Sequence, residues 1–387
     1  MYTVQNAKDD LTGVIHGGSL SKIKNINSLF RRAARKVGMK IDSRETERFQ
    51  EVEIFDGIYD YILNEDIKKI FDIRPQANRQ ITDNLQREMF ERFDHLKPDN
   101  TFHIKFNDAT KSLRISKILP NSVFLDNCNT IGSGSNAWTA GDDSTNITLD
   151  NVTFTQGGSS INFDVDGSTT TASISRTLPS AIDLSEHDEQ STLFYDAYFP
   201  NASAITSVEL RWGNSDSVYW SQTNSSPFDR SAYRDGWNIL DFAWNGATET
   251  GTVDPENIDY INIIITYDGT ADTDFRIDNI TSKLGQKWEV WYYSTFLFRS
   301  SSGTYSNTTS SDEDIINVDV DGEEIFLQEL LFAAAQQMQG EDAQADLAHA
   351  REELHGAQGK PGLYAEYKKS HPSNEMRSRT VYYRMQK

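Results

Sequence analysis

The stretch that decides the fold is TLFYDAYF (192–199). The segments after it are SVELRWG (207–213), SVYWSQT (217–223), WNILDF (237–242), YINIIITYDG (260–269) and DFRIDNI (274–280). In each of them apolar and polar residues alternate, and Gly, Asn, Asp or Ser residues separate one segment from the next. A period of two predicts strands with one buried face, and many short strands in a row are typical of a β-sandwich or jelly roll.

The same composition extends outward over residues 121–283, where SINFDVDGS (160–168) and TASISRTL (171–178) add two further predicted strands. This block holds 6 Lys and Arg against 24 Asp and Glu, so it carries most of the net charge of −21. Such a surface repels nucleic acid and favours solubility. We therefore expect a domain that is inserted into the chain and faces outward.

The segment before the block, residues 1–120, mixes predicted helix and strand. Gly13, Gly17 and Gly18 indicate a flexible or partner-ordered arm over residues 1–19. The predicted elements that follow are a helix over 27–39 capped by Ser21 or Asn25, a strand pair in EVEIFDGIYDYIL (51–63) that turns at Asp56-Gly57, a helix over 81–93, and a hairpin of TFHIKF (101–106) with KSLRIS (111–116). The first helix carries Arg31, Arg32, Arg35 and Lys36, which are interpreted as a solvated or subunit-facing surface, with nucleic-acid contact as the alternative.

The segment after the block, residues 284–387, begins with two predicted strands in KWEVWYYSTFLF (287–298). Helices are predicted over 323–338, 341–356 and 363–373, followed by the basic end MRSRTVYYRMQK (376–387). Taken together, the sequence predicts a multi-domain α+β chain. Its two flanks, 1–120 and 284–387, are expected to form a helical core with small β elements, which the antiparallel sandwich of 121–283 interrupts.

Neither catalysis nor a cofactor is indicated by the sequence. The seven histidines are scattered, and the sequence contains no HExxH, GxxxxGK[ST], GxGxxG or GxSxG motif. Cys128 is the single cysteine, so no disulfide within the chain is expected. The beginning of the chain lacks the pattern of a signal peptide and no apolar run is long enough to span a bilayer. We therefore expect a non-enzymatic, soluble protein assembled in a reducing cytoplasm.

Four segments of the block carry a resemblance to a known family. LFYDAYF (193–199), ELRWGNSDSVYW (209–220), DGWNILDF (235–242) and FRIDNI (275–280) resemble a carbohydrate-binding-module jelly roll. That resemblance implies a concave face that holds sugar and, in many members, a structural calcium ion. On the matching residues, Asp126 of FLDNC (124–128) and Asp278 of FRIDNI are the candidate calcium ligands.

Aromatic residues are the candidates for stacking on a sugar ring. Trp138, Trp212, Tyr219, Trp220, Trp237 and Trp244 form this set, although large aromatic residues also fill sandwich cores. Alternation sends Tyr219 and Trp220 to opposite faces of one strand. Core positions are expected for most of the set, and Trp212 and Trp220 are predicted to be exposed carbohydrate-binding residues.

The flanks resemble the head–tail adaptor, or connector, proteins of tailed bacteriophages. The residues that carry this likeness are SLFRRAARKV (28–37), YDYILNEDIKKIFDI (59–73), EEIFLQELLFAAAQQM (323–338) and LYAEYKKSHPS (363–373) with the basic tail after it. The resemblance implies a structural virion protein at the neck, assembled in the host cytoplasm into a homo-oligomeric ring of roughly a dozen subunits. Its partners are then the portal and the tail or neck proteins, and packaged DNA is contacted only indirectly.

Two other functions stay open at this point. The sandwich is the functional centre if the chain is a carbohydrate-binding adhesion or decoration protein of a phage or cell surface. A glycoside hydrolase with an accessory module needs two opposed carboxylates about 5–10 Å apart. The flanks are small for a catalytic domain, which argues against the hydrolase.

Overall fold

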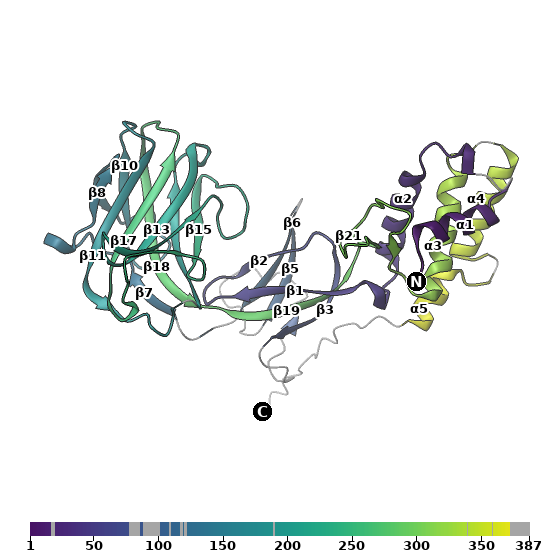
Figure 1. Ribbon diagram of the computed structural model, residues 1–387, viewed down its shortest axis with the longest axis horizontal. Helices are drawn as coiled ribbons and strands as arrows, with labels where there is room; N and C mark the ends of the chain where they lie inside the picture. Colours follow the sequence, from purple (N-terminus) through teal and green to yellow (C-terminus); the bar gives the residue numbers. More distant parts are fainter. Residues whose placement is uncertain are drawn as a thin grey trace, which may run out of the picture.

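The computed structural model describes residues 1–16, 20–76, 86–87, 101–107, 110–116, 119, 122–188, 190–338, 340–357 and 359–371. These residues form three bodies in a row, as Figure 1 shows. A β-sandwich lies at one end, a middle body of two smaller sheets follows it, and a helical bundle lies at the other end. Each body has its own cluster of buried apolar side chains.

The sandwich consists of two sheets, each of six antiparallel strands. The strands of the first sheet are, in spatial order, β15 (Gly236–Ala243), β12 (Ser191–Phe199), β18 (Asp272–Leu284), β10 (Ser160–Val165) and β9 (Ser144–Asp150), with β7 (Ser122–Asp126) paired to β18. The strands of the second sheet are β16 (Thr248–Thr250), β14 (Val218–Asn224), β13 (Ile205–Ser215), β17 (Ile258–Tyr267), β11 (Thr171–Ile182) and β8 (Thr139–Asp142).

Alternating side chains of the two sheets meet in the sandwich core. Ile261, Ile263 and Ile265 of β17 point inward, and the residues between them are partly exposed. Across the first sheet, Tyr195 and Phe242 stack with parallel rings whose centroids are 5.6 Å apart. Each large apolar side chain buried in this way contributes about 1.5–3 kcal/mol. The strands predicted in this region from alternation are confirmed.

The middle body joins the sandwich to the bundle through two small sheets. Their strands are β1 (Glu47–Ile54), β19 (Gln286–Ser294) and β3 (Ile67–Pro75) in one, and β2 (Asp60–Leu63), β6 (Thr110–Ser116), β5 (Thr101–Asn107) and β4 (Gln86–Arg87) in the other. Gly285 alone separates β18 of the sandwich from β19. At the junction, Phe194 of the sandwich lies edge-on to Phe55, with ring centroids 4.9 Å apart. Lys283 Nζ donates to the Asp56 carbonyl over 2.6 Å, so both polar and apolar contacts fix this junction.

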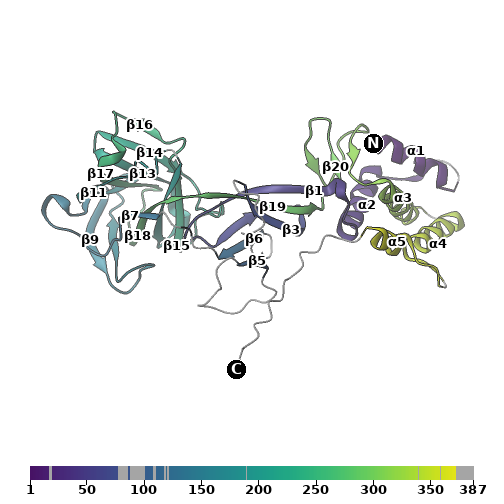
Figure 2. The ribbon, with the colours of Figure 1, turned by 90° about the horizontal axis from the view of Figure 1, so that it is seen from below.

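The bundle is built from both ends of the chain, as the view in Figure 2 makes clear. Its helices are α1 (Val4–Val14), α2 (Ile26–Lys40), α3 (Val320–Ala335), α4 (Glu341–His355) and α5 (Leu363–Ser370). A small sheet of β20 (Phe298–Arg299), β21 (Tyr305–Ser306) and β22 (Ile315–Ile316) adjoins them. Helix α3 is buried along most of its length and is the centre of the bundle. Asn25 and Asp319 accept hydrogen bonds from the first turns of α2 and α3, as N-caps do.

The predicted fold class is wrong for the flanking segments. The described chain is mostly β, and its helices are confined to one end instead of forming a core with small β elements. The flanks contribute the two sheets of the middle body, in which β1 pairs with β19 along all eight residues of β1. These two strands lie more than 200 positions apart in the sequence, so periodicity within a window cannot reveal their pairing.

Two local predictions in the first flank are also wrong. The expected flexible arm contains α1, which begins with a capping box of Thr3 and Asn6 and buries Val4, Ala7 and Leu11 in the bundle. The expected strand pair around Asp56-Gly57 does not form, because β1 pairs with β19 whereas β2 pairs with β6. The chain turns there at Gly57, with φ of +71°, and passes from one sheet to the other.

Other local predictions fare better. The hairpin of β5 with β6 is confirmed, as are helices α2, α3, α4 and α5. The basic end at 376–387 lies outside the described residues, and of the helix predicted over 81–93 only the two residues of β4 are described. No helix within the described ranges is long and apolar enough to cross a membrane.

Candidate functional site

The two tryptophans predicted to be exposed lie in the sandwich core. Trp212 is 0% exposed and Trp220 is 9% exposed. They pair with each other across β13 and β14, and their ring centroids lie 5.6 Å and 4.8 Å from that of Trp244. The prediction for Trp212 and Trp220 is therefore wrong, because both indole rings are enclosed where no sugar can stack on them.

Asp126 and Asp278, the candidate calcium ligands, engage separate partners. Asp126 Oδ1 accepts from the Cys128 N–H over 2.8 Å, and Oδ2 forms an ion pair with buried Arg176 of the opposite sheet. Burial raises the pKa of Asp126, although these bonds oppose the effect. With both oxygens engaged, Asp126 does not fit the role of a calcium ligand. No group of three His, Cys, Asp or Glu side chains among the described residues is placed to hold a metal ion.

Asp278 instead holds down a loop. Its Oδ2 accepts from the Thr155 N–H over 2.7 Å, the Thr155 hydroxyl over 2.9 Å and the Gln156 N–H over 2.9 Å. Thr155 Oγ1 also lies 2.5 Å from Asp196 Oδ2, and burial raises the pKa of Asp196. The loop of residues 151–159 thereby covers Asp278, which is fully buried. Covered in this way, the Asp196 and Asp278 carboxylates are not presented to a substrate as a hydrolase pair.

Beside this covered patch, a row of side chains crosses the outer face of the first sheet. We define the outer face as the surface of the first sheet that points away from the sandwich core. The row has one member on each of five strands, and cross-strand pairing fixes their order as Trp237, Tyr198, Arg276, Asn162 and Thr148. Side chains paired in this way share a face of the sheet. We call this set the central row.

The aromatic end of the central row is formed by Trp237 and Tyr198. Their rings meet edge to face, with centroids 5.5 Å apart. Arg276 Cζ lies 4.7 Å from the centre of the Tyr198 ring, a cation–π distance. Both aromatic residues are partly exposed, and Ile239 beside Trp237 is 40% exposed. This end therefore presents an apolar surface that Tyr198 and Arg276 support from the side.

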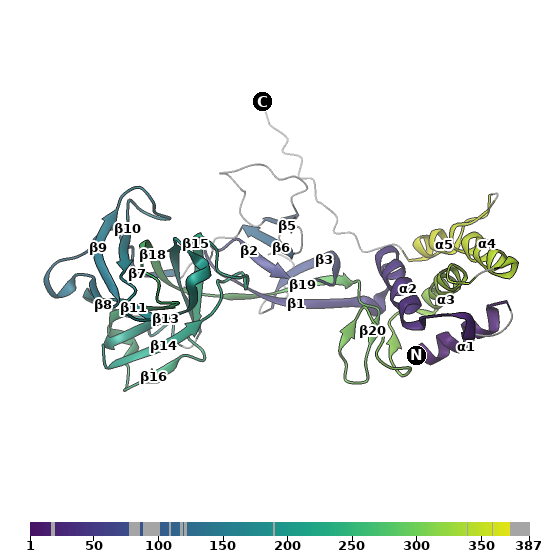
Figure 3. The same ribbon diagram turned by 90° about the horizontal axis from the view of Figure 1, so that it is seen from above.

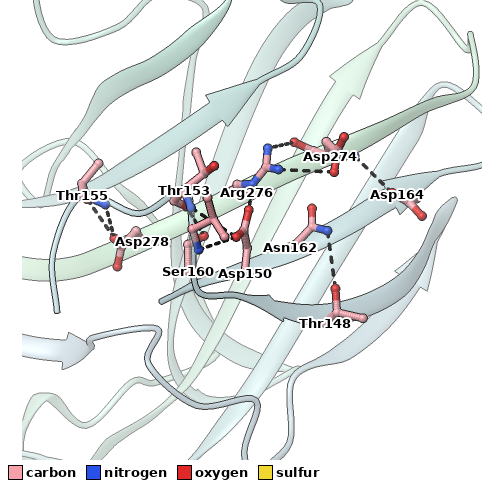
Figure 4. Close-up of polar contacts among 11 residues, drawn as sticks. Thr148, Asp150, Thr153, Thr155, Ser160, Asn162, Asp164, Asp274, Arg276 and Asp278 are labelled. Atoms are coloured by element: carbon pink, nitrogen blue, oxygen red, sulfur yellow. Dashed lines mark hydrogen bonds and ion pairs between the residues drawn. The ribbon is translucent and has the colours of Figure 1, made fainter. Parts of the chain in front are cut away.

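The polar end of the row is fixed by hydrogen bonds, which Figure 4 shows. Arg276 Nε donates to Asp150 Oδ2 over 2.6 Å, and Nη1 donates to the Asp274 carbonyl over 2.9 Å. Asn162 Nδ2 donates to Thr148 Oγ1 over 3.4 Å, whereas Asn162 Oδ1 is buried without a hydrogen-bond partner. Burial disfavours the charge of Asp150, but bonds from the Val152 N–H and from Arg276 hold its pKa below the usual value. The polar groups are thus oriented before any ligand arrives.

Carboxylates border the central row on both sides, along the direction of the strands. On one side lie Asp196 and Asp278, which pair across β12 and β18 next to the loop, and on the other lie Asp164 and Asp274. Asp164 Oδ1 accepts from the Asp274 N–H over 3.1 Å, and Asp164 Oδ2 accepts from Asn146 over 3.0 Å. The row consequently joins an apolar ring surface to uncharged amide and hydroxyl groups, with carboxylates as its borders.

Sequence reasoning placed Trp237 among six aromatic candidates but did not single it out, and it missed Tyr198, Arg276, Asn162 and Thr148. A signal was present in the strands themselves. Asp196 and Tyr198 alternate with Tyr195, Ala197 and Phe199, all of which are buried. An ionisable residue at every second position marks the face that points away from the core.

A scan against protein-family models finds no match, and no curated protein matches. Among solved structures, the sandwich is similar to the family 30 carbohydrate-binding module of a Clostridium thermocellum cellulosomal cellulase, with 12% identity, a TM-score of 0.31, and 43% of this chain and 96% of that one covered. An exo-β-agarase matches at 10% identity and a TM-score of 0.31, over 42% of this chain and only 24% of that one. These likenesses concern the sandwich alone and decide nothing about what this chain binds or catalyses.

Proposed function

We propose that the sandwich is a carbohydrate-binding module and that the central row of its outer face is the binding site. The observation that carries the proposal is the continuous sequence of contacts from Trp237 through Tyr198 to Arg276 and Asp150. Ligand sites combine apolar surface with a few oriented polar groups. A sugar presents the matching surfaces, a C–H face for the indole and hydroxyl groups for Arg276, Asn162 and Thr148.

Rigid support makes this row better suited to binding than an isolated exposed ring. Trp237 is held by Tyr198, and Tyr198 in turn faces a guanidinium that an ion pair fixes. A side chain already held in its binding conformation loses less conformational entropy when the ligand binds.

Binding to soluble polysaccharides tests the proposal. The full chain is run in native gels that contain each of several neutral glucans, galactans and mannans, and the affinity of any ligand found is measured by calorimetry. Trp237→Ala is expected to weaken binding at least about tenfold, as loss of an anchoring Trp does at binding sites. Phe49→Ala is the matched control, since Phe49 of β1 is an aromatic residue 48% exposed on the middle body.

Two results would contradict the proposal. One is that the intact chain migrates alike in all the gels. The other is that Trp237→Ala and Phe49→Ala bind a polysaccharide as tightly as the intact chain does, because the site then lies elsewhere.

We propose as a second function that the helical bundle attaches the sandwich to a larger assembly, specifically as a head–tail adaptor at the virion neck. The sandwich and the bundle lie at opposite ends of the molecule (Figure 3), and this arrangement supports the second proposal. A partner can bind the bundle while the outer face of the sandwich stays free. The surface of the bundle that we propose for this attachment includes one exposed stripe of α2, formed by Arg31, Arg35 and Met39 at intervals of four residues. A ring of roughly a dozen subunits in electron micrographs is the expected result. Monomers at every concentration tested would contradict it.

A further inference from the structure

We infer that the outer face takes an uncharged glycan chain of several sugar units, laid across the strands, and discriminates against glycans that carry carboxylate or sulfate groups. This inference rests on the proposed carbohydrate-binding function and specifies the class of its ligand. It follows from the length of the central row, from its borders and from the distribution of charge around it.

The length of the row indicates a chain rather than a single sugar. Five strands contribute to the row, which therefore covers four strand spacings of about 4.8 Å, or roughly 19 Å. Trp237 and Thr148 lie at its two ends, with Arg276 in the middle strand. One pyranose ring cannot touch both ends at once. A ligand that uses the indole and the polar end together must extend over several sugar units.

The borders of the row set the direction of the chain. Along the strands in one direction, the loop of residues 151–159 stands over Asp278, to which Thr155 and Gln156 are hydrogen-bonded. In the other direction, Asp164 and Asp274 are held together by the bond between Asp164 and the Asp274 N–H. A chain parallel to the strands meets the loop on one side and these carboxylates on the other. A chain across the strands stays on the row.

The charges on this face disfavour an anionic ligand. Arg276 and Lys283 are the basic residues of the five strands that carry the row, and Arg230 in the loop before β15 pairs with Asp241 of β15, so all three are engaged. Arg276 bonds to Asp150 and Asp274, and Lys283 bonds to the Asp56 carbonyl beyond the covered patch. The carboxylates of Asp164 and Asp274 remain beside the row, and like charges placed close together at a binding surface oppose association.

Two pairs of polysaccharides test the predicted discrimination against charged glycans. Hydroxyethylcellulose is compared with carboxymethylcellulose, and a neutral galactan with polygalacturonate, each at low and high salt. We expect the neutral member of a pair to bind more tightly, with a difference that shrinks at high salt because screening weakens the repulsion. Tighter binding of either acidic member would overturn the inference and leave the proposed function standing. Binding to no polysaccharide of any kind would overturn both.

A single variant locates the discrimination on this face. Asp274→Asn removes one border charge, and Asn tolerates the φ of +72° at this position. Its affinity for the acidic member of the pair should rise about threefold or more relative to the neutral member. Asp216→Asn makes the same charge change in the exposed turn between β13 and β14 and should alter neither affinity. Equal effects of the two variants would overturn the inference, since net charge alone then decides.

A length series tests the remaining part. Oligosaccharides of the neutral backbone that binds, from one sugar unit to six, are titrated into the full chain. Affinity should increase with each added unit until the chain spans the row and then level off. An affinity that is already maximal for the monosaccharide would overturn the extended mode of binding, although carbohydrate binding itself would be established.

Discussion

Arg276 and Asp150 form an ion pair over 2.6 Å that joins two strands which are not neighbours in the sheet. Strand β10 lies between β18 and β9, so the pair bridges it on the outer face. The Arg276 side chain is 11% exposed and that of Asp150 is 16% exposed. A pair so shielded from water is worth more than a typical surface pair, and it fixes the guanidinium on which Tyr198 rests.

Replacing Arg276 by Lys should destabilise the sandwich by about 2 kcal/mol, because an ammonium cannot bond to Asp150 and Asp274 as the guanidinium does. The measurement is urea unfolding followed by tryptophan fluorescence. Arg234→Lys is the control, since its ion pair with Asp229 has side chains 60% and 34% exposed. That change should cost less than about 0.5 kcal/mol. Equal losses in the two variants would show that the Arg276 pair is no more than a surface contact.

The stability of the sandwich should fall in acid partly through Asp150. The pKa of Asp150 is lower in the folded chain than its usual value, so the unfolded chain binds the proton more readily. The contribution of Asp150 is therefore present above the unfolded pKa of about 3.9 and is lost as the pH falls through the folded value. The measurement is the urea midpoint at pH 7, 4 and 3. Asp150→Asn should show a smaller decrease between pH 7 and pH 3 than the intact chain, and an equal decrease would contradict this assignment.

Truncation should affect a core tryptophan and a surface tryptophan differently. Trp212→Ala opens a cavity at a site with no exposure and should cost about 3–5 kcal/mol. Trp237→Ala removes a partly exposed ring and should cost about 1 kcal/mol or less while weakening glycan binding. Chemical unfolding and calorimetric titration on the same two variants separate these effects. A Trp237→Ala chain that fails to fold would place its ring in the core.

Two helical glycines provide a matched pair in the bundle. A Cβ at Gly38 of α2 would lie 2.7 Å from the Thr295 carbonyl oxygen, so Gly38→Ala should destabilise the bundle by about 1–3 kcal/mol. A Cβ at Gly13 of α1 would meet no atom within 4 Å. Gly13→Ala should therefore stabilise the bundle by up to about 1 kcal/mol through helix propensity alone. Thermal unfolding followed by circular dichroism compares them, and a stabilising Gly38→Ala would contradict the close packing of α2 on residue 295.

Local pattern predicted the elements of this chain better than it predicted their pairing. Alternation located the sandwich strands, and spacing with a cap at Asn25 located α2, because these signals lie within a few residues of one another. The pairing of β1 with β19 has no such signal, and the fold class of the flanks was wrong for that reason. Likewise, alternation predicts that Tyr219 and Trp220 lie on opposite faces of the strand, but it does not predict which of the two faces packs against the core.

The candidate site was hidden from the sequence for the same reason. Trp237, Tyr198, Arg276, Asn162 and Thr148 come from five strands whose spatial order differs from their order in the chain. Only the register of these strands makes them neighbours. Aromatic content instead singled out Trp212 and Trp220, whose side chains fill the sandwich core.

The passage of the chain from β18 through Gly285 into β19 has a mechanical consequence. A tether that pulls the sandwich away from the bundle acts along β19, which lies between β1 and β3 and pairs with both. Strand β19 is already extended and its backbone runs without a break from the sandwich toward the bundle, so this load passes through covalent bonds, while the ladder hydrogen bonds perpendicular to it keep the strand in place. A load perpendicular to β19, by contrast, breaks the ladder hydrogen bonds one pair at a time, starting from the end of the strand. The middle body is therefore strongest against tension along the long axis of the molecule.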